Sequence, residues 1–596
     1  MLVLVSRQIG NGRARIRPRD LGVVAVLAVV AAFAAGPVTG CAAGDMAVTV
    51  GGVTVGAGRR ADPPTGGPPD SLILLHTNDT HAQLLPFERS NGALAGGAAA
   101  RAERIRKERE RSRHTILLDG GDVFQGTPFF SLFGGVPDYR AMSMMGYASG
   151  ALGNHDLDNG PAAWIRTAKE AAFPVRSANV FVDAESSWAR KREEVPSALR
   201  RGARWIGGKK VPDSAELVFL TEKPWDVVER VGPVTDVAFF GLTTPDLERL
   251  VLRSRNGGVA VGDPIAAARY LVPRLREQAS MVICLSHMGE DMDRKLAERV
   301  PGIDVIVGGH SHTPLHAPVL VRNTTPNGYG GTVIVQAGYR GEYLGRLALY
   351  LEGKRLQGYS GRLLRVNPED GEDARVASML RPYAEEVSKE TGGVVFRSPA
   401  RIPQSGLRDG ETPLGNFVAD VVRWAGEDAD IGLINSGGIR AAMPAGDVTV
   451  ADVHTILPFD NKVVVVEMAG WQVRQLLDRV AQRLGKGGFL QVSGVKFVIT
   501  RDRASYIRVG EKEEALNSDR VYRVATVDYL AEGGDGYTHF EKGLGITSTG
   551  VLLREAAVRF LEEFPRYEFR KESRIRWEGS TSMFRGGRVG AGGGGR

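Results

Sequence analysis

The sequence predicts an α/β protein built from two domains. A chain of 596 residues is longer than one hydrophobic core usually accommodates. From Ser71 onward, short apolar runs alternate with helical patterns, which is typical of α/β architecture. A polar, helix-like stretch at residues 366–395 separates a first region of this kind from a second region that ends near residue 578. We therefore expect two α/β domains joined by a linker helix.

The first region contains apolar runs that predict buried strands. These strands are expected at residues 72–75, 115–118, 236–242, 281–285, 304–309 and 332–338, with helices at residues 99–112 and 161–172. The segment 184–225 is irregular and contains three tryptophans, and we interpret it as an insertion or a lid.

Both ends of the chain differ in amino-acid composition from the segment between them. A basic stretch precedes an uncharged, largely apolar run at residues 21–44, which indicates an export signal. "VTGC" at residues 38–41 resembles a bacterial lipoprotein signal, which implies a signal peptide over residues 1–41 and membrane attachment through a lipidated Cys41. An ordinary cleaved signal and an uncleaved membrane anchor remain open alternatives. Residues 42–70 are rich in Gly and Pro and are expected to form an unstructured tether, and residues 579–596 a disordered tail.

Charge and cysteine content exclude two classes of protein. The net charge of +7 comes from the ends: the first 20 residues carry +4 and the last 18 carry +3. With a neutral body, no general nucleic-acid surface is expected. The two cysteines do not indicate a disulfide framework, and Cys284 lies in an apolar run where it is expected to be a core residue.

Side chains that bind metals cluster just after the predicted strands of the first region. They are Asp79, His81, Asp122, Asn154, His155, Asp158, His287, His310 and His312. Five of the ten histidines of the chain are in this set, and the carboxyl ends of neighbouring strands meet at one edge of an open sheet. Imidazole, carboxylate and amide donors without thiolates suit zinc, manganese or a similar divalent ion. A bridging carboxylate would allow two ions, the usual arrangement for hydrolysing phosphate esters.

Four glycines accompany this set. Gly120 and Gly121 are expected to let the backbone approach the metals closely, and Gly153 and Gly160 to supply turn conformations.

In order and spacing, these motifs ("D-x-H", "GD", "GNHD", "H", "GHSH") resemble those of the calcineurin-like metallophosphatases. More closely, the chain resembles the bacterial UDP-sugar hydrolase/5′-nucleotidase family from about residue 71 to 565. The resemblance implies one metal on Asp79, His81, Asp122 and His312. It implies a second metal on Asp122, Asn154, His287 and His310. It further implies a catalytic dyad of His155 and Asp158; some relatives have Gln in place of His312.

The second region resembles the family's substrate-binding domain in "LINSGGIRAAMPAGDVTVADVHTILPFDNKVV" and "VDYLAEGGDGY". The resemblance implies that Phe459 and Tyr529 stack on a nucleobase, at about 1–3 kcal/mol for each aromatic ring. Tyr529 stands where the family commonly has Phe. Asp535 would accept hydrogen bonds from the ribose hydroxyls, and Arg408, Asn435 and Arg440 would hold base, ribose or phosphate.

The resemblance also specifies the fold and the activity. It implies a metallophosphatase β-sandwich flanked by helices over residues 71–365, a linker helix over 366–395 and an α/β substrate-binding domain over 396–578. We expect an exported two-metal enzyme that removes the 5′-phosphate from nucleotides, with cleavage of UDP-sugars as a candidate second activity. The alternatives are a 2′,3′-cyclic nucleotide phosphodiesterase/3′-nucleotidase, a sulfur-compound hydrolase of the same superfamily, or a nucleotide-binding surface protein without catalysis.

Overall fold

The computed structural model describes residues 47–50, 53–56, 71–89, 92–186, 193–231, 234–324, 330–353 and 355–578. The expected signal peptide with Cys41 and the expected tail at 579–596 lie outside these residues. Inside the expected tether, β1 (Ala47–Val50) and β2 (Val53–Gly56) pair as an antiparallel hairpin, so this part of the segment has regular structure. Among the described residues, no helix combines the length and apolar character needed to cross a bilayer.

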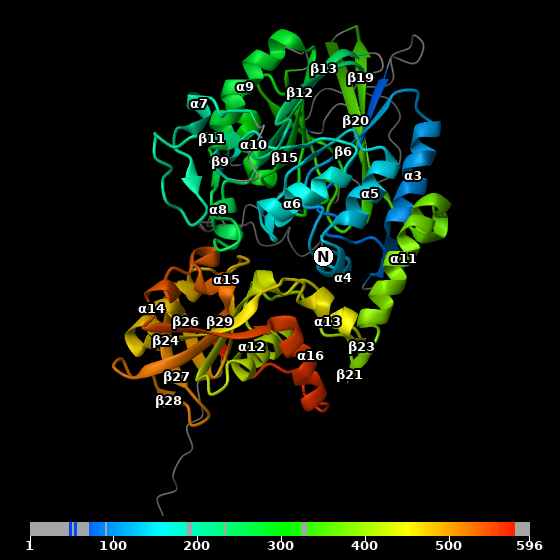
Figure 1. Cartoon of the computed structure of the whole chain (residues 1–596). Helices are drawn as coiled ribbons and strands as arrows, with labels where there is room; N and C mark the ends of the chain where they lie inside the picture. The colour runs from blue at the N-terminus through cyan, green and yellow to red at the C-terminus, as the bar shows by residue number, and fades with distance from the viewer. Residues whose placement is uncertain are drawn as a thin grey trace, which may run out of the picture. The chain divides into compact units, whose positions relative to one another are not determined.

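Two mixed six-stranded sheets form the core of the first domain (Figure 1). The first sheet has the order β20-β19-β3-β6-β7-β8: β3 (Ser71–Thr77), β6 (Thr115–Asp119), β7 (Ser149–Ala151), β8 (Val175–Arg176), β19 (Tyr343–Glu352) and β20 (Arg355–Arg365). The second sheet has the order β12-β13-β15-β16-β18-β17: β12 (Trp225–Val231), β13 (Val234–Thr243), β15 (Met281–His287), β16 (Val305–Val307), β17 (Val319–Arg322) and β18 (Gly331–Val335). In the first sheet β3, β6, β7 and β8 are parallel, and in the second β13, β15, β16 and β18 are parallel.

The two sheets pack face to face and are covered by helices on their outer faces. Leu72 and Leu74 of β3 belong to the apolar cluster between the sheets, whereas Ile73 and Leu75 belong to the cluster beneath the helices. This alternation explains why the strands are continuously apolar: both faces of each strand are buried. Cys284 packs beneath the helices of the second sheet, which confirms it as a core residue.

In Figure 1, α9 and α10 flank the second sheet, and α3 and α5 flank the first. The helices of this domain are α3 (Ala98–Glu110), α4 (Pro128–Phe133), α5 (Val136–Met145), η1 (His155–Leu157), α6 (Pro161–Thr167), η2 (Ala168–Glu170), α8 (Leu247–Leu250), α9 (Pro264–Gln278) and α10 (Glu290–Arg299). A short hairpin is formed by β4 (Pro86–Glu88) and β5 (Leu94–Gly96). The expected linker contains η3 (Pro368–Asp370) and α11 (Ala374–Thr391), and α11 packs on the helical side of the first sheet.

Segment 184–225 contributes two short strands, β10 and β11, to a small four-stranded sheet of the order β10-β14-β9-β11. Its elements are β9 (Val180–Asp183), α7 (Ser197–Arg200), β10 (Arg204–Trp205), β11 (Leu217–Phe219) and β14 (Val259–Val261). Its apolar side chains pack into the core, so we no longer interpret the described part of this segment as a lid.

The second domain is built on a five-stranded sheet of the order β25-β22-β29-β24-β30 and a four-stranded sheet of the order β28-β27-β26-β31. Its strands are β21 (Val394–Ser398), β22 (Ile431–Asn435), β23 (Gly446–Thr449), β24 (Lys462–Ala469), β25 (Leu490–Ser493), β26 (Val495–Thr500), β27 (Arg503–Val509), β28 (Glu514–Ala515), β29 (Val521–Val527), β30 (Gly545–Leu552) and β31 (Ile575–Trp577). Its helices are α12 (Pro413–Ala425), η4 (Ser436–Gly438), α13 (Val450–Ile456), α14 (Gly470–Ala481), α15 (Asp528–Ala531), η5 (Gly534–Gly536), η6 (Phe540–Lys542) and α16 (Leu553–Glu563).

Helix α12 illustrates how the sequence sets these elements. Thr412 caps its first turn by accepting from the Gly415 backbone N–H, and Pro413 occupies the first helical position. Leu414, Phe417, Val418, Val421 and Val422 follow the helical period and are buried. The prediction of a two-domain α/β fold is confirmed.

Candidate active site

The site lies where the parallel strands of both sheets end. Asp79 follows β3, Asp122 follows β6 and Asn154 follows β7, all in the first sheet. His287 ends β15, and the loop with His310 and His312 follows β16, both in the second sheet. The expectation that a single sheet edge would collect these side chains is wrong: of the seven candidate metal ligands, four follow strands of the first sheet and three come from the second.

One group of donors consists of Asp79, His81 and His312, whose ligand atoms all lie within 4.8 Å of one another. The two imidazole nitrogens, His81 Nε2 and His312 Nε2, are 3.0 Å apart, and His312 Nε2 is 3.3 Å from Asp79 Oδ1. Two nitrogens that ligate the same zinc at about 2.0–2.1 Å stand roughly this far apart. The spacing of this group therefore fits one divalent ion.

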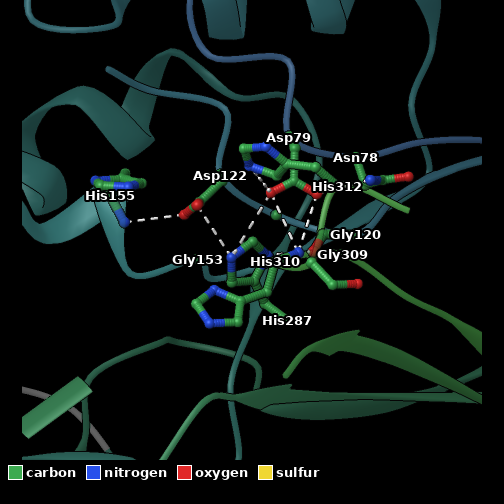
Figure 2. Close-up of polar contacts among 12 residues, drawn as sticks. Asn78, Asp79, Gly120, Asp122, Gly153, His155, His287, Gly309, His310 and His312 are labelled. Carbon is green, nitrogen blue, oxygen red and sulfur yellow. Dashed lines mark hydrogen bonds and ion pairs between the residues drawn. The ribbon is translucent and has the colours of Figure 1, made fainter. Parts of the chain in front are cut away.

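A second group consists of Asp122, His287 and His310. Asp122 Oδ2 lies 3.1 Å from His287 Nε2, and Asp122 Oδ1 accepts from the His155 backbone N–H at 2.9 Å (Figure 2). Beside this group, Asn154 Oδ1 is buried and accepts no hydrogen bond from any residue that the structure describes. An orphaned amide oxygen next to a carboxylate and imidazoles suits a second ion, because metal coordination would satisfy it.

Backbone carbonyls orient two of the ligand rings. His287 Nδ1 donates to the Gly120 carbonyl at 2.8 Å, and His81 Nδ1 donates to the Phe124 carbonyl at 3.2 Å. These contacts place the proton on Nδ1 and leave the Nε2 lone pair of each ring for a metal.

Burial and the neighbouring charges shift the pKa values of several candidate ligands. Burial opposes protonation of His287, but the Asp122 carboxylate outweighs it and raises the pKa of the ring to about 10. For His310, burial dominates and lowers the pKa to about 4. Burial would raise the pKa of Asp79, yet the charge of His312 overrides it and holds that pKa at about 2. Ionised carboxylates thus face the imidazole nitrogens, as a cation site requires.

The backbone of the site is strained. Five of the candidate ligands have a positive φ: Asp79, His81, Asp122, His310 and His312, with φ of 50°, 51°, 54°, 75° and 56°. Such conformations are unfavourable for residues other than glycine, and they persist only where the surrounding structure enforces them, often at functional sites.

Glycines allow close approach around the ligands. A Cβ added at Gly121 would lie 2.8 Å from His287 Nδ1, so this glycine allows the turn to pack closely on that ring. The expected approach of the Gly120 and Gly121 backbone to the metals stays a prediction. Gly153 has no positive φ, so its predicted role in supplying a turn conformation is wrong. Its Cα instead packs against Asp122, and an added Cβ would overlap with the carboxylate. Gly160, at the N-cap of α6, has a φ of 81°, a positive value that favours glycine and turns the chain into the helix.

The sequence did not reveal three residues that position the ligands. Asp156 accepts from the backbone N–H groups of Val123, Phe124 and Gly153, and so ties the Asp122 turn to the Asn154 turn. Asn78 donates to Asp79 Oδ2. Gln336 accepts from Ser311 and Thr313 and donates to the Gly309 carbonyl, which holds the loop of His310 and His312. Asp156 and Asn78 are sequence neighbours of ligands, whereas Gln336 has no local signal.

His155 and Asp158 form the predicted pair. His155 Nδ1 contacts Asp158 Oδ2 at 2.9 Å, and Gln125 donates to the same oxygen at 3.0 Å. Burial lowers the basicity of His155, but Asp158 and Asp122 outweigh it and raise its pKa above the usual value. The ring is therefore charged more readily than a free histidine, and its Nε2 is available to an anionic group.

A single cavity of about 580 Å³ joins these residues to the second domain. Asp122, Asn154, His155, Asp158, His310 and His312 line it from the first domain. All six residues predicted to bind substrate also line it, namely Arg408, Asn435, Arg440, Phe459, Tyr529 and Asp535. The structure thus brings both predicted sets to one place.

Contacts inside the cavity link the first-domain site residues to the candidate substrate-binding residues of the second domain. Arg440 Nη2 lies 3.3 Å from His81 Nε2, and the rings of Phe459 and His155 have centroids 5.5 Å apart. Asn435 donates to Asp535 Oδ2 at 2.9 Å, which orients that carboxylate.

Comparisons with known proteins agree with this geometry. Residues 72–314 match the family model of the calcineurin-like phosphoesterases, and residues 391–542 match that of the 5′-nucleotidase C-terminal domain. The crystal structure of a 5′-nucleotidase precursor from Thermus thermophilus is 32% identical and superposes with a TM-score of 0.74, covering 85% of this chain and 99% of that one. This chain belongs to the 5′-nucleotidase family.

Curated relatives extend the agreement. A 5′-nucleotidase from Vibrio vulnificus is 28% identical over 535 residues, which cover 83% of this chain and 90% of that protein. The trifunctional nucleotide phosphoesterase protein YfkN of Bacillus subtilis is 31% identical over 516 residues, which cover 80% of this chain. The chain spans only 33% of the length of YfkN. The predicted family is confirmed, and with it the prediction of a metal-dependent phosphoesterase.

Proposed function

We propose that this chain removes the 5′-phosphate from nucleotides with the help of two divalent metal ions. The observation that carries the proposal is the shared cavity: metal-binding side chains line one part of it, and an aromatic and polar set suited to a nucleoside lines another. A nucleotide has both features, a phosphate for the first part and a flat base for the second.

The residues around the cavity would hold the metals as two sets that share Asp122. Asp79, His81, Asp122 and His312 would bind one ion, and Asp122, Asn154, His287 and His310 the other. When bound, such a pair of ions polarises the phosphoryl group and stabilises both the entering and the leaving oxygen. Nitrogen and carboxylate donors favour zinc or manganese.

His155 would act on the phosphate directly. Its Nδ1 is held by Asp158, so its Nε2–H is free to donate to a phosphoryl oxygen on which negative charge develops. Asp158, held by Gln125, would keep the ring in this orientation and stabilise its charged form. Arg440 adds a second positive charge close to His81.

The second domain would hold the nucleoside. Phe459 and Tyr529 present aromatic rings to the cavity for stacking on the base, which tolerates different bases. Asp535, oriented by Asn435, would accept from the ribose hydroxyls, and Arg408 would contact the polar groups of the substrate.

A phosphate-release panel tests the proposal. The full chain, loaded with zinc or manganese, is assayed on AMP, UMP, UDP-glucose, 2′,3′-cyclic AMP and 3′-AMP. We expect phosphate from AMP and UMP, loss of turnover with a chelator, and recovery when the metal is restored. Release confined to 3′-AMP and the cyclic nucleotide would assign the alternative activity. Tight nucleotide binding without turnover in the metal-loaded protein would make the chain a binding protein.

For the cell, we propose export and attachment to a membrane through a lipidated Cys41, on the basis of the "VTGC" sequence at residues 38–41. Labelling with a radioactive fatty acid should mark the wild type but not Cys41→Ala. An unlabelled wild type would remove the lipid anchor from the proposal.

A further inference from the structure

Tyr529 differs from a phenylalanine only in a hydroxyl, and this hydroxyl makes two specific contacts. It accepts from the Asp535 backbone N–H at 3.1 Å. It donates to the Arg249 carbonyl, in α8 of the first domain, at 3.0 Å. Burial raises the pKa of the Tyr529 phenol well above its usual value, so the hydroxyl keeps its proton and can make both contacts.

Asp535 needs such contacts because its backbone is in an unfavourable conformation. It has a φ of 53°, in the left-handed region that residues with a side chain rarely adopt. Its N–H is held by Tyr529, its carbonyl by Arg483 Nη2 at 2.6 Å, and its carboxylate by Asn435. Of these three anchors, Tyr529 also hydrogen-bonds to the first domain, through the Arg249 carbonyl.

The Tyr529 ring packs closely against the same turn. A Cβ added at Gly534 would lie 2.6 Å from Tyr529 Cζ, so the glycine is required for the ring to lie over the turn. Because the Tyr529 ring contacts the turn at Gly534, its hydroxyl lies within hydrogen-bonding distance of the Asp535 N–H, and both residues line the cavity.

We infer that the Tyr529 hydroxyl is a positioning group that holds Asp535 in its ribose-binding conformation and anchors that conformation to the first domain. The inference rests on the proposed function, in which Asp535 accepts from the ribose hydroxyls. It assigns two tasks to one residue: the ring stacks on the base, and the hydroxyl sets the ribose specificity.

The test compares a ribonucleotide with a nucleotide that lacks the ribose hydroxyls. Tyr529→Phe keeps the ring, and kcat and KM are measured on AMP and on 2′,3′-dideoxy-AMP with the metal-loaded full chain. Loss of the two hydrogen bonds should reduce kcat/KM for AMP about 5- to 20-fold, chiefly through KM. Turnover of the dideoxynucleotide should change by less than about twofold, because it offers Asp535 no hydroxyl.

Tyr567→Phe is the matched control. Its hydroxyl donates to Asp420 at 2.6 Å, in the same domain but away from the lining of the cavity. We expect this variant to treat both substrates as the wild type does, although it also loses a partly buried hydrogen bond.

The outcomes separate the inference from the proposed function. An equal loss on both substrates, or no loss on AMP, in Tyr529→Phe would overturn the inference and leave the proposed function standing. A wild type that hydrolyses the two nucleotides equally well would refute ribose recognition by Asp535, and the inference would fall with it. A wild type that releases no phosphate from AMP would refute the proposed function itself.

Discussion

Replacing Gly153 by alanine tests how tightly the metal-binding residues are packed. The residue has an ordinary backbone conformation, so alanine introduces no dihedral strain and acts only through its methyl group. That methyl would stand 2.8 Å from Asp122 Cα, and closer still to the Asp122 carboxylate and N–H. Ordinary contacts of a Cβ begin at 3.4 Å. The Asp122 turn must therefore move, by about 1 Å at the carboxylate.

A shift of this size should be costly, because the proposed arrangement has Asp122 shared between both metals. A misplacement of about 1 Å at a reacting centre can reduce the rate about 100-fold. We expect Gly153→Ala to lose about that factor in kcat/KM for AMP, and to bind metal more weakly. Steady-state phosphate release at several metal concentrations, with metal content by mass spectrometry, measures both effects.

Gly150→Ala is the control for this experiment. Gly150 lies in β7, and its added Cβ would meet Asp119 and Phe173 at 3.6 Å, an ordinary contact. Thermal unfolding of both variants shows whether either one is simply destabilised. If Gly153→Ala retained activity within about threefold of Gly150→Ala, Asp122 would tolerate displacement and the packing argument would be refuted.

Three further predictions concern residues outside the ligand set. Gln336→Leu should weaken metal binding about 10- to 100-fold, since it releases the loop of His310 and His312; an unchanged metal titration would contradict this. Arg255→Met should lower kcat/KM for AMP about tenfold without loss of metal, because Arg255 joins the Asp158 carbonyl to the Asp460 carbonyl beside Phe459; full activity would show that this link is dispensable. Burial, and after it the charge of Arg554, lowers the pKa of His454 from 6.5 to about 4 in the folded protein. As the pH drops from about 6.5 to 4, His454 is therefore protonated in the unfolded chain before it is protonated in the folded one, and the stability of the fold decreases. His454→Gln should lose less thermal stability than the wild type over that range, and parallel melting curves for the two proteins would contradict the assignment.

The sequence by itself determined many of the strands, the domain order and the set of candidate ligands. Apolar runs such as residues 72–75 and 281–285 are strands in the structure, because burial on both faces leaves a continuous apolar pattern. The candidate ligands could be named because each one lies at the end of a strand or in the turn that follows it, and local order along the chain preserves that relation. Family resemblance then assigned the substrate-binding set, and all six of its residues line the cavity.

Tertiary structure alone decided which strands share a sheet and what surrounds each ligand. Asp79 and His310 come from different sheets, and nothing local to either residue encodes that pairing. Gly153 is important because its missing side chain leaves space for Asp122. Gln336 is important because it hydrogen-bonds to a loop more than 20 residues away in the sequence. The Tyr529 hydroxyl acquires its partners only when Arg249, 280 positions earlier, is brought beside it. Periodicity and spacing describe neighbours along the chain, whereas steric fit and hydrogen bonding depend on neighbours in space, and these are known only after folding.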